Sequence, residues 1–72
     1  MVKIKADSLR LINLRVREGL SITEFSKKVG VSQPTISRIE SGKFSLSPFL
    51  ANKIAVTLKV PFDDIFSIVE GD

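Results

Sequence analysis

Hydrophobic residues recur along most of this chain every three or four positions, which is the spacing of an amphipathic helix. Glycines, prolines and serines that can begin a helix interrupt the pattern at short intervals and divide it into about five helical segments. Only "VKIK", residues 2–5, alternates as a strand does, and only briefly. The pattern therefore predicts an all-α fold, an orthogonal bundle of five short helices.

The first two helices have clear start and stop signals. We expect the first helix over residues 8–18, with Ser8 as its N-cap and Gly19 after its end. The second helix begins at Ser21, which forms a capping box with Glu24 three residues later. Gly30 ends this helix, because glycine accepts the left-handed backbone that a helix end often needs.

Ser32 begins the third helix, with Pro34 in the first turn, where a missing N–H costs nothing. Gly42 ends it. The pair Ser47-Pro48 begins a fourth helix, and "VPFDDIF" begins a short fifth helix at Pro61. The helical spacing predicts that the core includes the following residues: Leu11, Leu14, Phe25, Val29, Ile36, Ile39, Leu50, Ile54, Ala55 and Leu58.

Composition narrows the possible functions. A chain of 72 residues has room for one core, so we expect a single domain over residues 1–72. It contains no cysteine, histidine, tryptophan or tyrosine, so it lacks the thiolate and imidazole ligands of most zinc sites and the usual general base. We therefore expect neither an enzyme nor a protein that needs a metal or another cofactor.

Charge is unevenly distributed. Residues 1–59 contain all eleven Lys and Arg and four acids, a net charge of +7, whereas residues 60–72 contain four acids and no base. A basic body suits a polyanion, although ordinary surface charge would give the same composition. No apolar run is long enough to span a membrane and no signal peptide is visible, so we expect a cytoplasmic protein.

Residues 22–41 have the pattern of a helix-turn-helix unit. The two helices cross closely, and the small residue Ser26 lies where they meet. Gly30 allows the turn, Val31 fills it, and Ile36 and Ile39 can bury the second helix against the first.

Three stretches then resemble a known family: "LRVREGLS" (14–21), "VGVSQPTISRIESGK" (29–43) and "LANKIAVTLKVPFDDIF" (50–66). Together they are similar to the helix-turn-helix proteins typified by phage repressors and Cro, also called XRE-like. The resemblance covers about residues 9–66. It implies a lambda-repressor-like DNA-binding domain in which residues 33–41 form the recognition helix, lying in the major groove of double-stranded DNA.

The resemblance also implies which side chains read bases: Gln33, Pro34, Ser37 and Arg38. A glutamine amide can donate to N7 of adenine and accept from N6, and an arginine can donate to O6 and N7 of guanine. A phosphate contact is the alternative role of Arg38, and plain solvation is the alternative for Gln33. Residues expected to bind phosphates are Ser21, Thr23, Thr35, Ser41, Lys43 and Arg10.

Glu40 needs a cationic partner. Its carboxylate lies near the C-terminal end of a helix that faces DNA, where both the helix dipole and the phosphates oppose it. The family often pairs this acid with an arginine before the glycine that follows the first helix, which is Arg15 here. The resemblance thus implies a partly buried Arg15–Glu40 ion pair, rather than two independent surface charges.

The chain departs from the family pattern at several positions. Ile22 stands where the family often has a glutamine that binds phosphate and braces the recognition-helix glutamine, so we expect Gln33 to lose that brace. Pro34 can offer only apolar contact, such as to a thymine methyl group. Phe44 and Leu46 replace polar loop residues, and we expect them to pack under the loop or to touch a partner.

We therefore predict a sequence-specific transcriptional regulator, a repressor, with no small-molecule ligand. One such domain reads few base pairs, so a homodimer is expected. In the apolar tail we expect Ile65 and Phe66 to complete the core, and Ile68 and Val69 to form the dimer seam or else to belong to the core as well. An antitoxin that binds a toxin protein and represses its own promoter is the main alternative. A protein-interaction module without DNA binding is a second, which Gln33 and Arg38 argue against.

Overall fold

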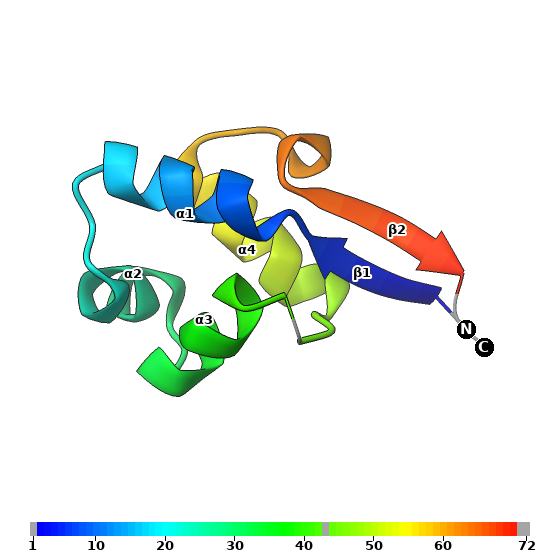
Figure 1. Ribbon diagram of the computed structural model, residues 1–72, viewed down its shortest axis with the longest axis horizontal. Coiled ribbons are helices and arrows are strands. Elements are labelled where there is room, and N and C mark those ends of the chain that lie inside the picture. Colours follow the sequence, from blue (N-terminus) through cyan, green and yellow to red (C-terminus); the bar gives the residue numbers. More distant parts are fainter. Residues whose placement is uncertain (1, 43, 71–72) are drawn as a thin grey trace.

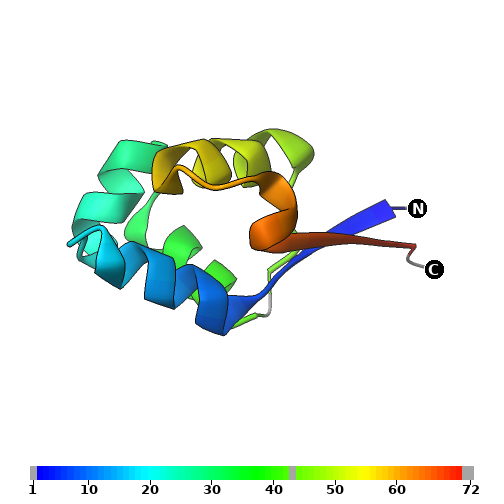
Figure 2. The same cartoon turned by 90° about the horizontal axis from the view of Figure 1, so that it is seen from above.

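The computed structural model describes residues 2–42 and 44–70. Along the chain the elements are β1 (Val2–Ala6), α1 (Ser8–Arg17), α2 (Ile22–Val29), α3 (Gln33–Glu40), α4 (Pro48–Leu58), the 3-10 turn η1 (Phe62–Asp64) and β2 (Phe66–Glu70). The helices pack around one core, and the two strands form an antiparallel ribbon that extends away from them (Figure 1). Seen from above, α1 and α4 run along opposite sides of the body (Figure 2).

The prediction of five helices and no sheet is wrong at both ends of the chain. The expected fifth helix is the single 3-10 turn η1, after which the chain continues as β2. β1 pairs with β2 in the register Val2↔Glu70 to Ala6↔Phe66. Each terminal segment thus satisfies its backbone groups through a partner about sixty residues away, which no local pattern reveals. Within the described residues the fold is mostly helical, with four α-helices and one small sheet.

Most of the predicted helix starts are confirmed. Ser21, Ser32 and Ser47 are the N-caps of α2, α3 and α4, and each accepts a backbone N–H of its own helix. The start of α1 is one residue earlier than expected, because Asp7 provides the cap and Ser8 is the first helical residue. Short polar side chains therefore set the helix boundaries, as their preference for this position predicts.

The core lies between the four helices. All the core positions expected from helical spacing are buried except Leu50, which is half-buried. The core also contains Ile65 and Phe66, as expected, and three residues that the helical spacing did not indicate: Ile4, Leu46 and Ala51. Leu46 forms an isolated β-bridge with Ile4, and Phe44 packs partly buried beside the core. The two apolar loop residues therefore pack under the loop, which was one of the two expectations, the other being contact with a partner.

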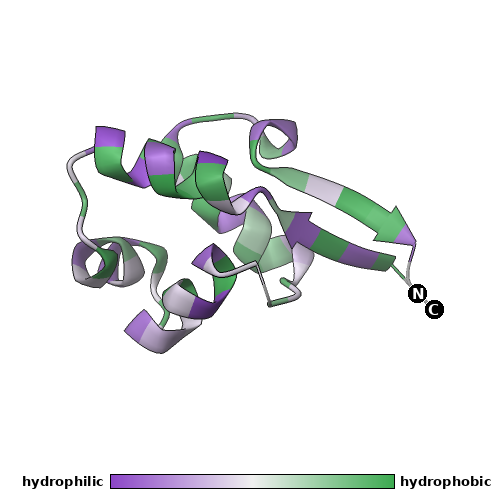
Figure 3. Ribbon diagram, viewed as in Figure 1, coloured by the Kyte–Doolittle hydropathy of each residue, from purple (hydrophilic) through white to green (hydrophobic). Residues whose placement is uncertain are grey.

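The strand ribbon has an apolar face that is only partly covered. Val2, Ile4 and Ile68 share one face, because paired residues and alternate positions point the same way. Ile4 is buried, whereas Val2 and Ile68 remain 61% and 63% exposed. Hydrophobic residues thus continue along both strands beyond the helices (Figure 3). Val69 follows Ile68 and so lies on the opposite face of the ribbon.

In the part of the chain that the structure describes, no helix is long and apolar enough to cross a bilayer.

Candidate nucleic-acid interface

The turn between α2 and α3 closes around Ser26. Gly30 adopts a left-handed φ of 90°, and its N–H donates to the Ser26 carbonyl at 2.8 Å. The Val31 N–H donates to the same carbonyl at 3.0 Å. Ser26 is buried, and its hydroxyl donates to the Thr23 carbonyl at 2.8 Å, so this small polar residue is satisfied within α2. The turn therefore holds α3 at a defined angle to α2.

One side of α3 is anchored and the other is open. Ile36 and Ile39 are fully buried against the core. The four expected base readers, Gln33, Pro34, Ser37 and Arg38, are all exposed and line one shallow hollow in the surface. Residues spaced by one, four and five positions share one helix face, so the structure brings these side chains together.

Gln33 has a partner on α2. The Thr23 hydroxyl donates to Gln33 Oε1 at 3.1 Å. Ile22 has no polar side-chain atom, so the hydrogen bond from that position is absent, as expected. The next residue along α2 supplies the hydrogen bond instead.

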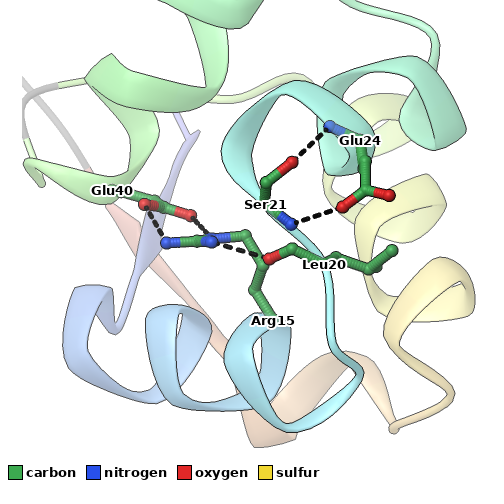
Figure 4. Close-up of polar contacts among 5 residues, drawn as sticks. All are labelled: Arg15, Leu20, Ser21, Glu24 and Glu40. Carbon is green, nitrogen blue, oxygen red and sulfur yellow. Dashed lines mark hydrogen bonds and ion pairs between the residues drawn. The ribbon is translucent and has the colours of Figure 1, made fainter.

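The N-terminus of α2 combines free backbone donors with a capping carboxylate. Ser21 Oγ accepts the Glu24 N–H, and the Ser21 N–H donates to Glu24 Oε1, each at 3.1 Å, which completes the predicted capping box (Figure 4). Hydrogen bonds from Ser21 lower the pKa of the Glu24 carboxyl, and the bond from the Ser21 backbone N–H is the largest cause. The N–H groups of Ile22 and Thr23 lie in the first turn and lack an intrahelical acceptor, so they can bind an anion.

The other hydroxyls expected near phosphates already have partners at the ends of α3. Thr35 Oγ1 shares a hydrogen bond of 2.8 Å with Ser32 Oγ at the N-cap. The Ser41 hydroxyl donates to the Arg38 carbonyl at 2.7 Å. Lys43, also expected to bind phosphate, lies outside the described residues.

Arg10, also expected to bind phosphate, lies apart from the hydroxyl groups around α3. Its Nη2 lies 2.6 Å from Asp64 Oδ2, and both side chains are partly exposed. Asp64 belongs to η1, which is on the far side of the body from α3 (Figure 1, orange). The structure therefore joins Arg10 to the start of the C-terminal segment.

Arg15 and Glu40 form a mostly buried ion pair between α1 and α3 (Figure 4). Arg15 Nε donates to Glu40 Oε2 at 2.7 Å, and Nη2 to Oε1 at 3.4 Å. Nη1 donates to the Leu20 carbonyl at 2.8 Å. The two side chains are only 12% and 7% exposed. The one acid on α3 is thus turned inward and neutralised.

Comparison with known proteins identifies the family. Residues 11–65 match the HTH_3 helix-turn-helix family. This chain is a member of that family, the XRE/Cro type of DNA-binding helix-turn-helix proteins.

Its relatives agree with this assignment. An HTH-type transcriptional regulator of Methanocaldococcus jannaschii is 45% identical over 58 residues, which are 81% of this chain and 86% of that protein. Another of Archaeoglobus fulgidus is 39% identical over 57 residues, 79% of this chain and 81% of that protein. The restriction-modification controller protein C.AhdI of Aeromonas hydrophila shares the fold, with a TM-score of 0.74 at 24% identity over 79% of this chain and 86% of its own. The HTH_3 protein is thus a DNA-binding transcriptional regulator of a non-enzymatic family.

Two features of this HTH_3 site could not be singled out from the sequence. The Thr23–Gln33 hydrogen bond joins residues ten positions apart on different helices. Lys53 on α4 lies beside the turn, since a methyl group added to Gly30 would lie 3.1 Å from its Nζ. The net positive charge of residues 1–59 indicates that cations surround the site, but it does not distinguish Lys53 from Lys27 or Lys28.

Proposed function

We propose that this HTH_3 regulator binds double-stranded DNA sequence-specifically. Its recognition helix, residues 33–41, consists of α3 and the following residue Ser41 and would lie in the major groove. The observation that carries the proposal is the exposed surface shared by Gln33, Pro34, Ser37 and Arg38 on a helix anchored from behind. A rigid backbone under a polar face is what base readout requires, because base contacts discriminate only when side chains are held in register.

Each of the four side chains has a chemically suitable base partner. Gln33 suits adenine through its amide, and Arg38 suits guanine or a neighbouring phosphate. Pro34 can contact a thymine methyl group, and Ser37 can donate or accept at either kind of base pair. Among the described residues no acid forms an ion pair with Arg38, and Glu40, the only acid on α3, is paired with Arg15.

Phosphate contacts would position the protein. At the N-terminus of α2 we propose Ser21 and Thr23, through backbone N–H groups and the helix dipole. Thr35 in the first turn of α3, and Ser41 and Lys43 after its end, are proposed to bind phosphates of the adjoining strand. Arg10 would reach a phosphate only by giving up Asp64, so we expect it to contribute least.

We propose that the protein acts as a repressor, by occupying an operator as a dimer. Support for a second copy comes from the apolar groove bordered by Val2, Phe49 and Ile68, of which Phe49 is 77% exposed. Exposed apolar surface of this kind marks interaction sites. Val69 lies on the other face of the ribbon. We therefore assign the dimer contact to Ile68 alone, and not to Ile68 and Val69 together.

Sedimentation equilibrium tests the dimer. Ile68→Lys should shift the protein to the monomer, whereas Val69→Lys on the opposite face should not. A wild-type protein that stays monomeric at micromolar concentration would contradict the dimer. A different protein that co-purifies stoichiometrically from the native host, and is lost in Ile68→Lys, would favour the antitoxin alternative instead.

Substitution of the reading face tests the DNA proposal. Gln33→Ala should lose discrimination at one base pair, by roughly 1–3 kcal/mol, measured as the ratio of dissociation constants for matched and mismatched duplexes. Lys43→Ala should weaken binding to all duplexes alike. If both variants behaved in the same way, the division into base readers and phosphate contacts would be wrong.

A further inference from the structure

The contact between Thr23 and Gln33 has a defined polarity. The hydroxyl Oγ1 lies 3.1 Å from Oε1 of the Gln33 amide. An amide oxygen can only accept, so the single hydroxyl proton of Thr23 must be donated to it. The oxygen end of the amide is thereby turned toward α2. Among the described residues no protein group accepts from the Gln33 amide nitrogen, so both of its hydrogens remain available.

The two ends of an amide present opposite chemistry to a base. Adenine offers an acceptor at N7 and a donor at N6, whereas guanine offers acceptors at both N7 and O6. An amide that can turn over freely can present its NH2 group to either purine. An amide held in one orientation matches one arrangement of donors and acceptors better than the other.

We propose that Thr23 is a specificity-determining positioning residue: its hydroxyl fixes the orientation of the Gln33 amide and so sharpens the choice of purine at the base pair that Gln33 reads. This inference rests on the proposed function, since it assumes that Gln33 reads a base. It is compatible with the phosphate role proposed above for Thr23, because that role uses the backbone N–H and this one uses the side-chain hydroxyl.

The setting of Thr23 suits this role. Its carbonyl accepts the buried Ser26 hydroxyl at 2.8 Å, which secures the first turn of α2. Its β-branched side chain has few χ1 rotamers, so the hydroxyl is held in place at little entropic cost. Ile22, the residue before it, has no polar side-chain atom and packs partly buried beside the core. The brace therefore belongs to Thr23.

A double-mutant cycle on DNA tests the inference. Thr23→Val removes the hydroxyl and keeps the shape of the side chain, whereas Thr23→Ser keeps the hydroxyl. The cycle is completed by the double variant that combines Thr23→Val with Gln33→Ala. Dissociation constants are measured for four duplexes that differ only at the base pair whose discrimination Gln33→Ala abolishes. We expect Thr23→Val to reduce the preference between the two purines roughly two- to tenfold, the loss of about one hydrogen bond. Thr23→Ser should restore most of it, and Thr23→Val should change nothing further in Gln33→Ala.

Two results would overturn the inference alone, and two others would overturn the proposed function on which it rests. Thr23→Val could weaken all duplexes equally in both backgrounds, which would make its hydroxyl a phosphate contact. It could leave the purine preference unchanged, which would make the hydrogen bond irrelevant to readout. A wild-type protein with no preference at any base pair would defeat the proposed function itself, and a preference that Gln33→Ala leaves intact would show that Gln33 reads no base.

A measurement without DNA tests the brace directly. The side-chain amide signals of Gln33 in ¹H–¹⁵N spectra should move in Thr23→Val. They should not move in Thr57→Val, a control that removes a hydroxyl whose bond, to the Lys53 carbonyl at 2.8 Å, stays within α4. Unchanged Gln33 signals in Thr23→Val would contradict the hydrogen bond on which the inference depends.

Discussion

Replacing Arg15 by methionine should destabilise this protein far more than the loss of a surface charge would. Methionine keeps much of the apolar stem but removes all three hydrogen bonds of the guanidinium group, two to Glu40 and one to the Leu20 carbonyl. The Glu40 side chain, only 7% exposed, would be left as an uncompensated charge between α1 and α3.

The magnitude follows from that burial. Breaking a buried ion pair by removing one partner costs about 3–5 kcal/mol, whereas an exposed pair contributes about 0–1 kcal/mol. Because both side chains retain slight solvent contact, we take the lower end and expect a loss of about 3 kcal/mol. A chain of this length has a free energy of unfolding of about 4–11 kcal/mol, so Arg15→Met should stay folded, with about 1–8 kcal/mol remaining.

Urea unfolding followed by circular dichroism measures the effect. Arg17→Met, an exposed position at the end of the same helix, is the matched control and should change the free energy of unfolding by less than about 0.5 kcal/mol. The double variant Arg15→Met with Glu40→Met should recover at least half of the loss, because no charge is then stranded. Equal effects of Arg15→Met and Arg17→Met would show that the Arg15–Glu40 pair contributes no more to stability than an exposed charge does.

Three further predictions concern the helix ends. Because its pKa is lowered in the folded protein, ionised Glu24 stabilises the fold fully above its ordinary value of 4.5, and this contribution is lost as the pH falls through the lowered value. The stability difference between wild type and Glu24→Gln, which keeps the capping box, should therefore shrink from pH 7 to pH 3 in urea titrations. Gly30→Ala and Gly19→Ala should each lower stability by about 1–2 kcal/mol through strain at positive φ, and an unchanged midpoint for either would contradict this. Lys59→Gly should raise the melting temperature by a few degrees, a gain of about 0.5 kcal/mol, by relieving the left-handed residue after α4; a lower value would refute it.

Local signals in the sequence predicted the helical body well. Serine N-caps, the glycine after α2 and the apolar spacing act within one or two turns, so a single sequence reveals them. The strand ribbon escaped prediction because its stability depends on pairing β1 with β2 across the whole chain. Asp63 and Asp64 suited a helix start, yet η1 ends after one turn and the chain continues as β2, which pairs with β1.

Of the candidate site, only the exposed face of α3 could be predicted from the sequence alone. Helical geometry alone puts Gln33, Ser37 and Arg38 together once α3 is located. Contacts between helices were not predictable in this way. The Arg15–Glu40 pair was expected only through the family resemblance, and the Thr23–Gln33 hydrogen bond depends on the crossing angle of α2 and α3.

Selection of bound sequences from random DNA duplexes shows whether this protein recognises a DNA sequence, and the affinity for the selected site is then measured across salt concentrations. We predict one recurring sequence, an affinity that falls steeply with salt because phosphate contacts release counterions, and a preference at one base pair that Gln33→Ala removes. Recovery of no common sequence, with binding that does not depend on salt, would contradict it.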